Sequence, residues 1–160
     1  MSFKESSVKI TELLRKEYIL EQLKAKNKEE VLAELAGVFA RGAIKFDSGA
    51  MLRALLEREK LGSTGIGDGI AIPHGKFAGL KEILVAFGRS RAGIAFAALD
   101  GKPVHLFFLL MAPENSAGQH LKVLAKISRM LKDGAFRKRL LEARMHDDLV
   151  RVITEKDDEC

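Results

Sequence analysis

The sequence predicts an α/β sandwich in which a mixed β-sheet lies between layers of α-helices, within a single domain. Three observations favour this class. Apolar residues recur at helical spacing early and late in the chain, while the middle holds short apolar runs typical of buried strands. The length of 160 residues suits one domain. Apolar residues make up 47% of the chain, enough for a core without disulfides, and the one cysteine, Cys160, favours a reducing compartment.

The first part of the chain is predicted to be mainly helical. Apolar residues within 10–14 indicate a short opening helix, and residues 18–23 are compatible with a strand. Asn27 followed by Glu30 is a capping-box pattern, which predicts a helix that ends near Gly42.

A second helix is expected to lead into the β-rich middle of the chain. Asp47 or Ser48 can cap this helix, and its last turn is the charged run at residues 57–60. A glycine-rich segment follows it directly. The candidate strands beyond are residues 83–88, 93–98 and 104–111.

The last part of the chain returns to helical spacing. A helix is expected from Asn115 onward, and Asp133 with the following glycine breaks it and caps the next one. Asp147 or Asp148 is predicted to cap a final helix. The acidic residues 155–159 are typical of a frayed end.

Composition narrows the location and the partners. We expect an ordered domain over residues 8–155, with flexible tails at residues 1–7 and 156–160. The polar start carries no signal-peptide pattern, and the longest apolar run, residues 106–112, is too short to cross a membrane. The net charge is +5, but the densest basic run, residues 137–139, lacks interleaved aromatic residues and is typical of a solvated helix face. We therefore expect a cytoplasmic protein that neither binds nucleic acid nor inserts into a membrane.

The most informative segment is residues 61–76, LGSTGIGDGIAIPHGK. Its glycines allow close approach of the backbone to a ligand, and its serine and threonine add hydroxyl donors. The short apolar run at 70–72 is typical of a buried strand end. It is followed by Pro73-His74-Gly75, which presents a histidine side chain at that end.

Several common site types do not fit this segment. Its glycine spacing matches neither the P-loop nor the dinucleotide-binding pattern, and it precedes a strand instead of opening a helix. No GxSxG nucleophile elbow is present. The spacings of His74, His105 and His120 match no compact zinc pattern, and no cysteine joins them.

The four histidines have different contexts. His146 lies beside two aspartates near a helix start, and His105 lies within a strand, so a structural role is the better interpretation of both. His120 is expected on the first turns of a helix that follows a strand end, where α/β proteins collect their ligands. His74 is set apart by the glycine-rich segment before it.

These residues suit a histidine that accepts a phosphoryl group. Such a site needs a presented imidazole nitrogen at His74, together with donors for the phosphoryl oxygens, which Ser63, Thr64 and Gly65 can supply. Turn capping is the structural alternative for the two hydroxyls. Arg58 offers a fixed positive charge, and its planar guanidinium suits phosphate.

The sequence also resembles a known family. Residues 57–76 are similar to the active-site motif of phosphotransferase-system enzyme IIA domains of the fructose–mannitol class (type 2), and most resemble its nitrogen-regulatory branch. Weaker similarity continues through GIAF, DGKPV, LFFLLMAP and QHL, so that the resemblance covers roughly residues 8 to 155. It implies an α/β sandwich of the mannitol-IIA type with a mixed sheet flanked by helices.

The resemblance also implies a chemistry. His74 matches the family's phosphoryl acceptor, His120 its second active-site histidine, and Arg58 its motif arginine. Phosphate comes from a histidine-phosphorylated carrier protein, HPr or its nitrogen-branch relative, and neither a metal nor a cofactor is needed. His105 departs from the acidic residue that many relatives carry at this position, and its role stays open.

Two functions are compatible with this resemblance. One is a regulatory phosphocarrier whose phosphorylation state tunes target proteins. The other is a sugar-uptake IIA that passes phosphate to an enzyme IIB. A solitary domain and the form of the 61–76 segment favour the first.

Overall fold

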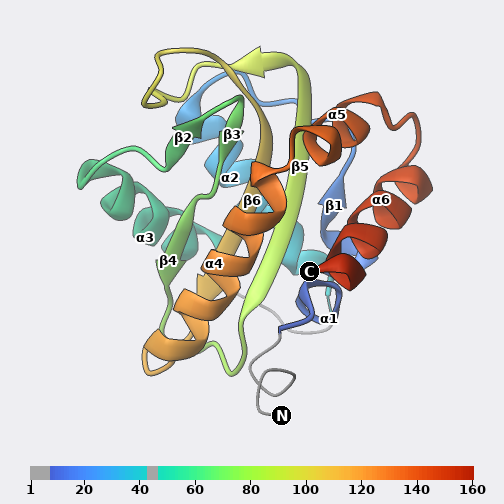
Figure 1. Cartoon of the computed structure of the whole chain (residues 1–160). Coiled ribbons are helices and arrows are strands. Elements are labelled where there is room, and N and C mark those ends of the chain that lie inside the picture. Colours follow the sequence, from blue (N-terminus) through green and yellow to red (C-terminus); the bar gives the residue numbers. More distant parts are fainter. Residues whose placement is uncertain (1–7, 43–46) are drawn as a thin grey trace.

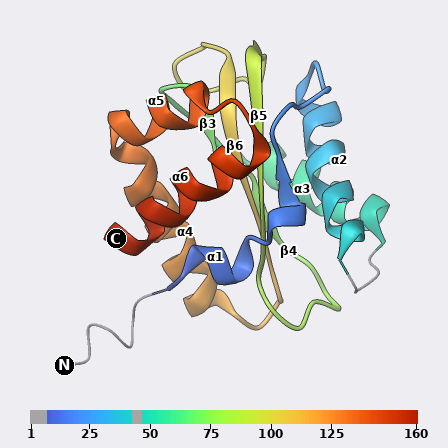
Figure 2. The ribbon, with the colours of Figure 1, turned by 90° about the vertical axis from the view of Figure 1, so that its right-hand side faces the viewer.

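The computed structural model describes residues 8–42 and 47–160 and contains one mixed sheet between two helical layers (Figures 1 and 2). The strands are β1 (Ile19–Leu20), β2 (Gly65–Gly67), β3 (Ile70–Ala71), β4 (His74–Lys76), β5 (Leu84–Ile94) and β6 (Val104–Ala112). The α-helices are α1 (Ile10–Leu13), α2 (Lys28–Val38), α3 (Ser48–Lys60), α4 (Ala117–Lys132), α5 (Gly134–Glu142) and α6 (His146–Glu159). The predicted α/β sandwich is confirmed.

The two longest strands organise the sheet. Strands β5 and β6 pair antiparallel at its centre, and the path of the sheet is β1-β5-β6-β3-β2. Strand β1 runs parallel to β5, while β3 and β4 both run parallel to β6, one after the other along its length. Strand β6 is therefore paired on both sides, which buries its backbone and explains its nearly continuous apolar sequence.

Helices cover both faces of this sheet. Figure 2 shows α2 and α3 on one face and α4, α5 and α6 on the other, with α1 next to α6. Apolar residues of both layers and of the central strands form one buried core. The helical layers thus meet the sheet from two sides, as the order of elements in the sequence predicts.

Most helix starts agree with the sequence. The side chains of Asn27, Asp47 and Asp133 each accept a backbone N–H in the first turn of the helix that follows. The last helix differs from expectation, because its N-cap is Met145 and neither Asp147 nor Asp148 caps it. Asp148 lies inside the first turn, where its carboxylate accepts the backbone N–H of Met145 at 3.2 Å.

The strand predictions need more correction. The strand expected at residues 18–23 is reduced to β1, since a 3₁₀ turn occupies Lys16–Tyr18. The separate strand expected at residues 93–98 does not form, because β5 continues to Ile94. Two short strands that were not predicted, β2 and β4, lie within the glycine-rich segment at residues 61–76, and β4 begins at His74 itself.

The structure differs from the flexible tail expected at residues 156–160. Helix α6 continues to Glu159, and Asp157 is fully buried in it. Its carboxylate lies 2.6 Å from Lys126 Nζ of α4 and accepts hydrogen bonds from the backbone of Ile10 and from Thr11. These contacts hold the end of the chain against α1 and α4. The expected N-terminal tail lies outside the described residues.

Candidate active site

His74 is presented by the pairing of β4 with β6. It lies opposite Leu110, and the carbonyl of Pro73 accepts the N–H of Leu110 at 2.9 Å. The imidazole Nδ1 lies 2.8 Å from the carbonyl oxygen of Ile72. Because a carbonyl can only accept, Nδ1 carries the proton and Nε2 keeps its lone pair. Arg58 Nε donates to that Nε2 at 3.3 Å.

This environment keeps the His74 ring neutral. Burial lowers the pKa of His74 from its usual value of 6.5, and the nearby Arg58 lowers it further, against the opposing effects of the Ile72 carbonyl and of Glu59. At neutral pH the imidazole is therefore uncharged. An uncharged Nε2 with a free electron pair is the form that acts as a nucleophile.

His120 of α4 packs edge-on against the ring of His74. It is the fourth residue of α4, as the sequence predicts, and its ring centroid lies 5.5 Å from that of His74 at an interplanar angle of 81°. Burial, with the neighbouring His74 and Lys76, lowers the pKa of His120. The second imidazole is thus also neutral at pH 7 and can offer one N–H donor to a group placed between the two rings.

Arg58 joins the acceptor to the glycine-rich segment. It lies in the last turn of α3, and its Nη1 donates to the carbonyl of Gly62 at 2.9 Å while its Nε reaches His74. The cavity beside it has a volume of about 170 Å³. Its lining consists of Arg58, Ser63, Thr64, Ile66, Ile72, His74, Leu124 and Ser128. The structure thus brings five of the six predicted site residues, all but Gly65, to this cavity or into contact with His74.

Ser63 and Thr64 make hydrogen bonds within the protein. Ser63 Oγ donates to the carbonyl of Phe96 at 3.1 Å and accepts the N–H of Gly65 at 3.0 Å. Thr64 Oγ1 donates to Glu59 Oε2, and the Thr64 side chain is almost fully buried. In this state both hydroxyls support the turn. Their role as phosphate ligands stays a prediction, since it requires these bonds to be exchanged.

Gly65 is required by close packing. A Cβ at this position would lie 2.9 Å from the Cβ of Ala98, closer than side-chain carbons approach one another. The backbone of Gly65 also pairs in β2 and accepts the N–H of Leu99 at 2.9 Å. Its glycine identity is explained by this contact with the 96–99 segment, whether or not its N–H also meets a phosphoryl oxygen.

The sequence analysis missed three polar side chains near the cavity. Glu59 Oε1 accepts the N–H of Thr64 at 3.2 Å and lies 2.8 Å from Lys28 Nζ of α2. Ser128 of α4 lines the cavity. Ser128 interrupts the apolar stripe of α4, and a polar residue at such a position could have indicated this site from the sequence. The Lys28–Glu59 pair had none, because 31 residues separate its members.

The other two histidines lie elsewhere. His105 is the second residue of β6, near the opposite end of that strand from Leu110, and its Nδ1 lies 2.9 Å from the carbonyl oxygen of Ser90. His146 begins α6, where its Nε2 lies 2.8 Å from the carbonyl oxygen of Lys16. Each ring bridges two segments, and neither lines the His74 cavity.

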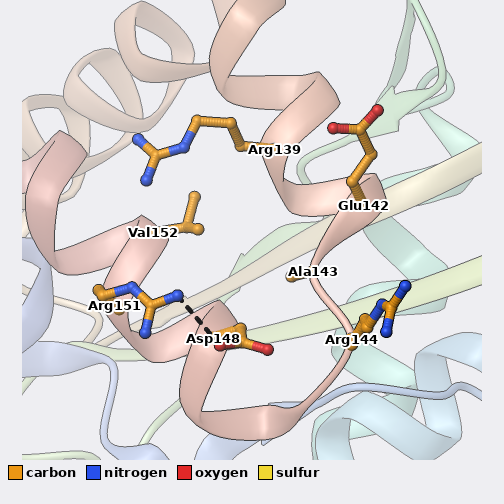
Figure 3. Close-up of a pocket in the computed structure, with 7 residues that line it drawn as sticks. All are labelled: Arg139, Glu142, Ala143, Arg144, Asp148, Arg151 and Val152. Carbon is orange, nitrogen blue, oxygen red and sulfur yellow. Dashed lines mark hydrogen bonds and ion pairs between the residues drawn. The ribbon is translucent and has the colours of Figure 1, made fainter.

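A second hollow lies at the turn between α5 and α6 (Figure 3). Two of its three arginines pair with acidic side chains: Arg151 lies 3.0 Å from Asp148, and Arg139 lies 2.6 Å from Glu155. Mixed, paired charges of this kind are typical of a solvated surface. The His74 cavity is therefore the candidate active site.

Two further observations concern metal sites and membrane spans. Within residues 8–42 and 47–160, no three His, Cys, Asp or Glu side chains are grouped so that they could hold a metal ion. In the same part of the chain, no helix is both long and apolar enough to span a bilayer.

The site thus combines, within an α/β sandwich, a neutral histidine on a sheet strand with a second histidine and an arginine. The chain belongs to the family described as "Phosphoenolpyruvate-dependent sugar phosphotransferase system, EIIA 2", whose family model matches residues 12–156. This membership confirms the resemblance noted in the sequence.

Individual relatives come from both branches of the family. The chain is 44% identical over 135 residues to a nitrogen regulatory protein of Bradyrhizobium diazoefficiens, an alignment that covers 84% of this chain and 88% of that protein. It is 41% identical over 150 residues to the fructose-specific EIIABC component of Bacillus subtilis, covering 94% of this chain but only 24% of that longer protein. The crystal structure of the nitrogen regulatory protein IIA-Ntr from Neisseria meningitidis superposes with a TM-score of 0.83 at 35% identity, covering 91% of this chain and 99% of that one.

Proposed function

We propose that this protein is a phosphocarrier that receives a phosphoryl group on Nε2 of His74 from a histidine-phosphorylated carrier protein, HPr or its nitrogen-branch relative. The observation that carries the proposal is the pair of bonds to the ring. Nδ1 donates its proton in a hydrogen bond to the carbonyl of Ile72 at 2.8 Å, while Nε2 accepts a hydrogen bond from Arg58 Nε at 3.3 Å, beside the cavity. Family membership supports the same acceptor.

The transfer step follows from this geometry. The lone pair of Nε2 attacks the phosphorus in line, and a new N–P bond forms as the donor's N–P bond breaks. The electron pair of the broken bond returns to the donor imidazole. The proton stays on Nδ1 of His74, which donates it in a hydrogen bond to the Ile72 carbonyl, and this bond orients the ring throughout.

Arg58 and His120 have complementary roles in this proposal. Arg58 Nε occupies the position that the phosphorus takes, so the guanidinium moves from Nε2 to the phosphoryl oxygens, where a planar pair of donors is well suited. His120 donates an N–H from the opposite side. Together they stabilise negative charge on the equatorial oxygens.

The regulatory branch is the better supported of the two functions. The nitrogen regulatory protein of Bradyrhizobium is 44% identical to this chain, and the IIA-Ntr structure from Neisseria superposes on it with a TM-score of 0.83. Phosphorylation adds nearly two negative charges beside Leu121 and Ile66, which changes the partners that this surface fits. The setting is the cytoplasm, where the phosphorylated carriers act. Transfer to an enzyme IIB is the second candidate, supported by the match to the fructose component.

The test is phosphorylation by purified enzyme I, phosphoenolpyruvate and a carrier protein. We expect one acid-labile phosphoryl group per chain, and NMR of the labelled imidazole should place it on Nε2. Because burial lowers the pKa of His74, receipt of phosphate should persist below pH 6.5. Labelling of Nδ1, or no labelling by either type of carrier, would contradict the proposal. Transfer onward to an enzyme IIB at the rate of receipt would favour the sugar branch.

Exposed apolar side chains surround the cavity and form the proposed docking surface. Ile66 lines the cavity, Leu121 follows His120, and Leu99 donates its backbone N–H to Gly65. Leu99 and Leu121 are 76% and 65% exposed, unusually high values for large apolar residues next to a site. An apolar rim around a charged centre is the pattern of a transient protein interface.

Replacing Leu99 and Leu121 by alanine should weaken docking without harming the fold. We expect the KM for the carrier to rise roughly tenfold, as loss of two contact side chains costs about 1–2 kcal/mol, with kcat unchanged. Met145→Ala is the control, since Met145 is 66% exposed but lies at the start of α6. Equal effects of the two changes would remove this surface from the interface.

A further inference from the structure

The segment that closes the cavity, residues 62–65, is held at three points. Arg58 bonds the carbonyl of Gly62, Ser63 bonds Phe96, and Glu59 bonds Thr64. The last attachment is double, because the carboxylate of Glu59 accepts both the N–H and the hydroxyl of Thr64. The shape of the cavity wall depends on these bonds.

One of the three attachments is disturbed by the reaction. Arg58 donates to His74 Nε2 through Nε while it holds Gly62 through Nη1. Phosphorylation of Nε2 removes the first bond and draws the guanidinium toward the new oxygens. The segment then relies on Ser63 and on Glu59 to keep its position.

The side chain of Glu59 is fixed by burial and by an ion pair. Its side chain is only 5% exposed, and such a buried carboxylate needs compensation. Lys28 of α2 provides it at 2.8 Å, and Lys28 Nζ also lies 4.5 Å above the ring of Phe96. The Lys28–Glu59 pair thus connects α2, the end of α3 and the 62–65 segment, and no member of it bonds the His74 ring.

We infer that Glu59, held by Lys28, is a positioning residue for phosphoryl transfer: it keeps residues 62–65 in place while Arg58 changes partners between the free and the phosphorylated imidazole. This inference rests on the proposed function. It also assigns the Thr64 hydroxyl to Glu59 in both states and leaves phosphate binding to Arg58, His120 and backbone N–H groups. Thr64 then acts through its bond to Glu59 and does not touch the phosphoryl group.

A double-mutant cycle on transfer kinetics separates the two roles of Thr64. Glu59→Gln keeps the shape of the side chain but loses its charge, and Thr64→Val removes only the hydroxyl. For each single variant we expect kcat to fall about tenfold to a hundredfold, with the KM for the carrier and the melting temperature little changed. The double variant should be no slower than Glu59→Gln alone, because both changes act through the same contact between residues 59 and 64.

Matched variants make the outcome decisive. Glu57→Gln is the control, since Glu57 lies on the same helix but is 70% exposed and paired with Lys60. Lys28→Met should reproduce the loss in kcat and Lys28→Arg should restore most of it. Multiplying effects in the double variant, or an unchanged kcat in Glu59→Gln, would overturn the inference while leaving phosphorylation of His74 intact. Failure of the wild-type protein to accept phosphate would instead contradict the proposed function.

Discussion

His74→Gln is expected to abolish phosphoryl receipt, a loss of at least roughly 10³-fold, because it removes the only group proposed to form a bond to phosphorus. The glutamine amide can still donate to the carbonyl of Ile72, so the β4–β6 pairing should survive and the melting temperature should change little. The measurement is phosphate incorporation from a labelled carrier, followed by intact-protein mass spectrometry under alkaline conditions.

His120→Ala is the matched control for this result. The variant keeps Nε2 of His74 and its contact with Arg58, and should still accept phosphate, although more slowly because one donor is lost. Full incorporation into the His74→Gln protein would show that the acceptor lies elsewhere. Incorporation lost equally in both variants would mean that the two imidazoles act as a unit.

Asp157→Ala should produce the largest loss of stability from a single change outside the active site. Asp157 is fully buried and holds Lys126 at 2.6 Å, and its removal leaves a buried ammonium whose remaining partners are backbone carbonyls, of Val8 among others. Removing one member of a buried ion pair costs about 3–5 kcal/mol, which for a chain of this size lowers the melting temperature by roughly 6–20 °C. Thermal unfolding followed by circular dichroism measures the effect.

The neighbouring Asp158 provides the control. It pairs with Lys9 at 2.9 Å, but its side chain is 66% exposed, so Asp158→Ala should change stability by less than about 1 kcal/mol. Adding Lys126→Met to Asp157→Ala should recover part of the loss, since no uncompensated charge remains. Equal effects of Asp157→Ala and Asp158→Ala would show that the end of α6 contributes little.

The Asp157–Lys126 pair should also make the stability of the protein depend on pH. Burial raises the pKa of Asp157, but Lys126 and the N–H and hydroxyl groups of Ile10 and Thr11 outweigh it, so the pKa lies below the usual 3.8. A carboxyl with a lowered pKa contributes stability above about pH 4, and this contribution disappears as the pH falls through its folded-state value. The difference in stability between the wild-type protein and Asp157→Ala should therefore narrow in acid.

Features determined by neighbouring residues were predictable from the sequence. The caps at Asn27, Asp47 and Asp133 need only a side chain and a backbone N–H two or three residues away, and all three were predicted correctly. The order of helices and strands followed from apolar spacing in the same way. The choice of His74 as the acceptor came from one short segment and from its resemblance to a family motif.

Features that depend on distant residues were missed or predicted incorrectly. The acidic end of the chain looked solvated, because nothing near Asp157 in the sequence shows that Lys126 and Thr11 surround it. Strand β4 has only three residues and forms because it can pair with one edge of β6. A short strand has too little pattern of its own to predict.

The sequence by itself determined the class of fold, the family and the identity of the candidate acceptor. Only the tertiary structure decided which nitrogen of His74 keeps its lone pair, that His120 lies 5.5 Å away, and that Glu59 is held by Lys28. The physical reason is the distance along the chain between the interacting residues. Helix caps and apolar periods are set within a few residues, whereas hydrogen-bond partners and the loss of water around a buried charge depend on segments that meet only when the sheet pairs and the helices pack on it.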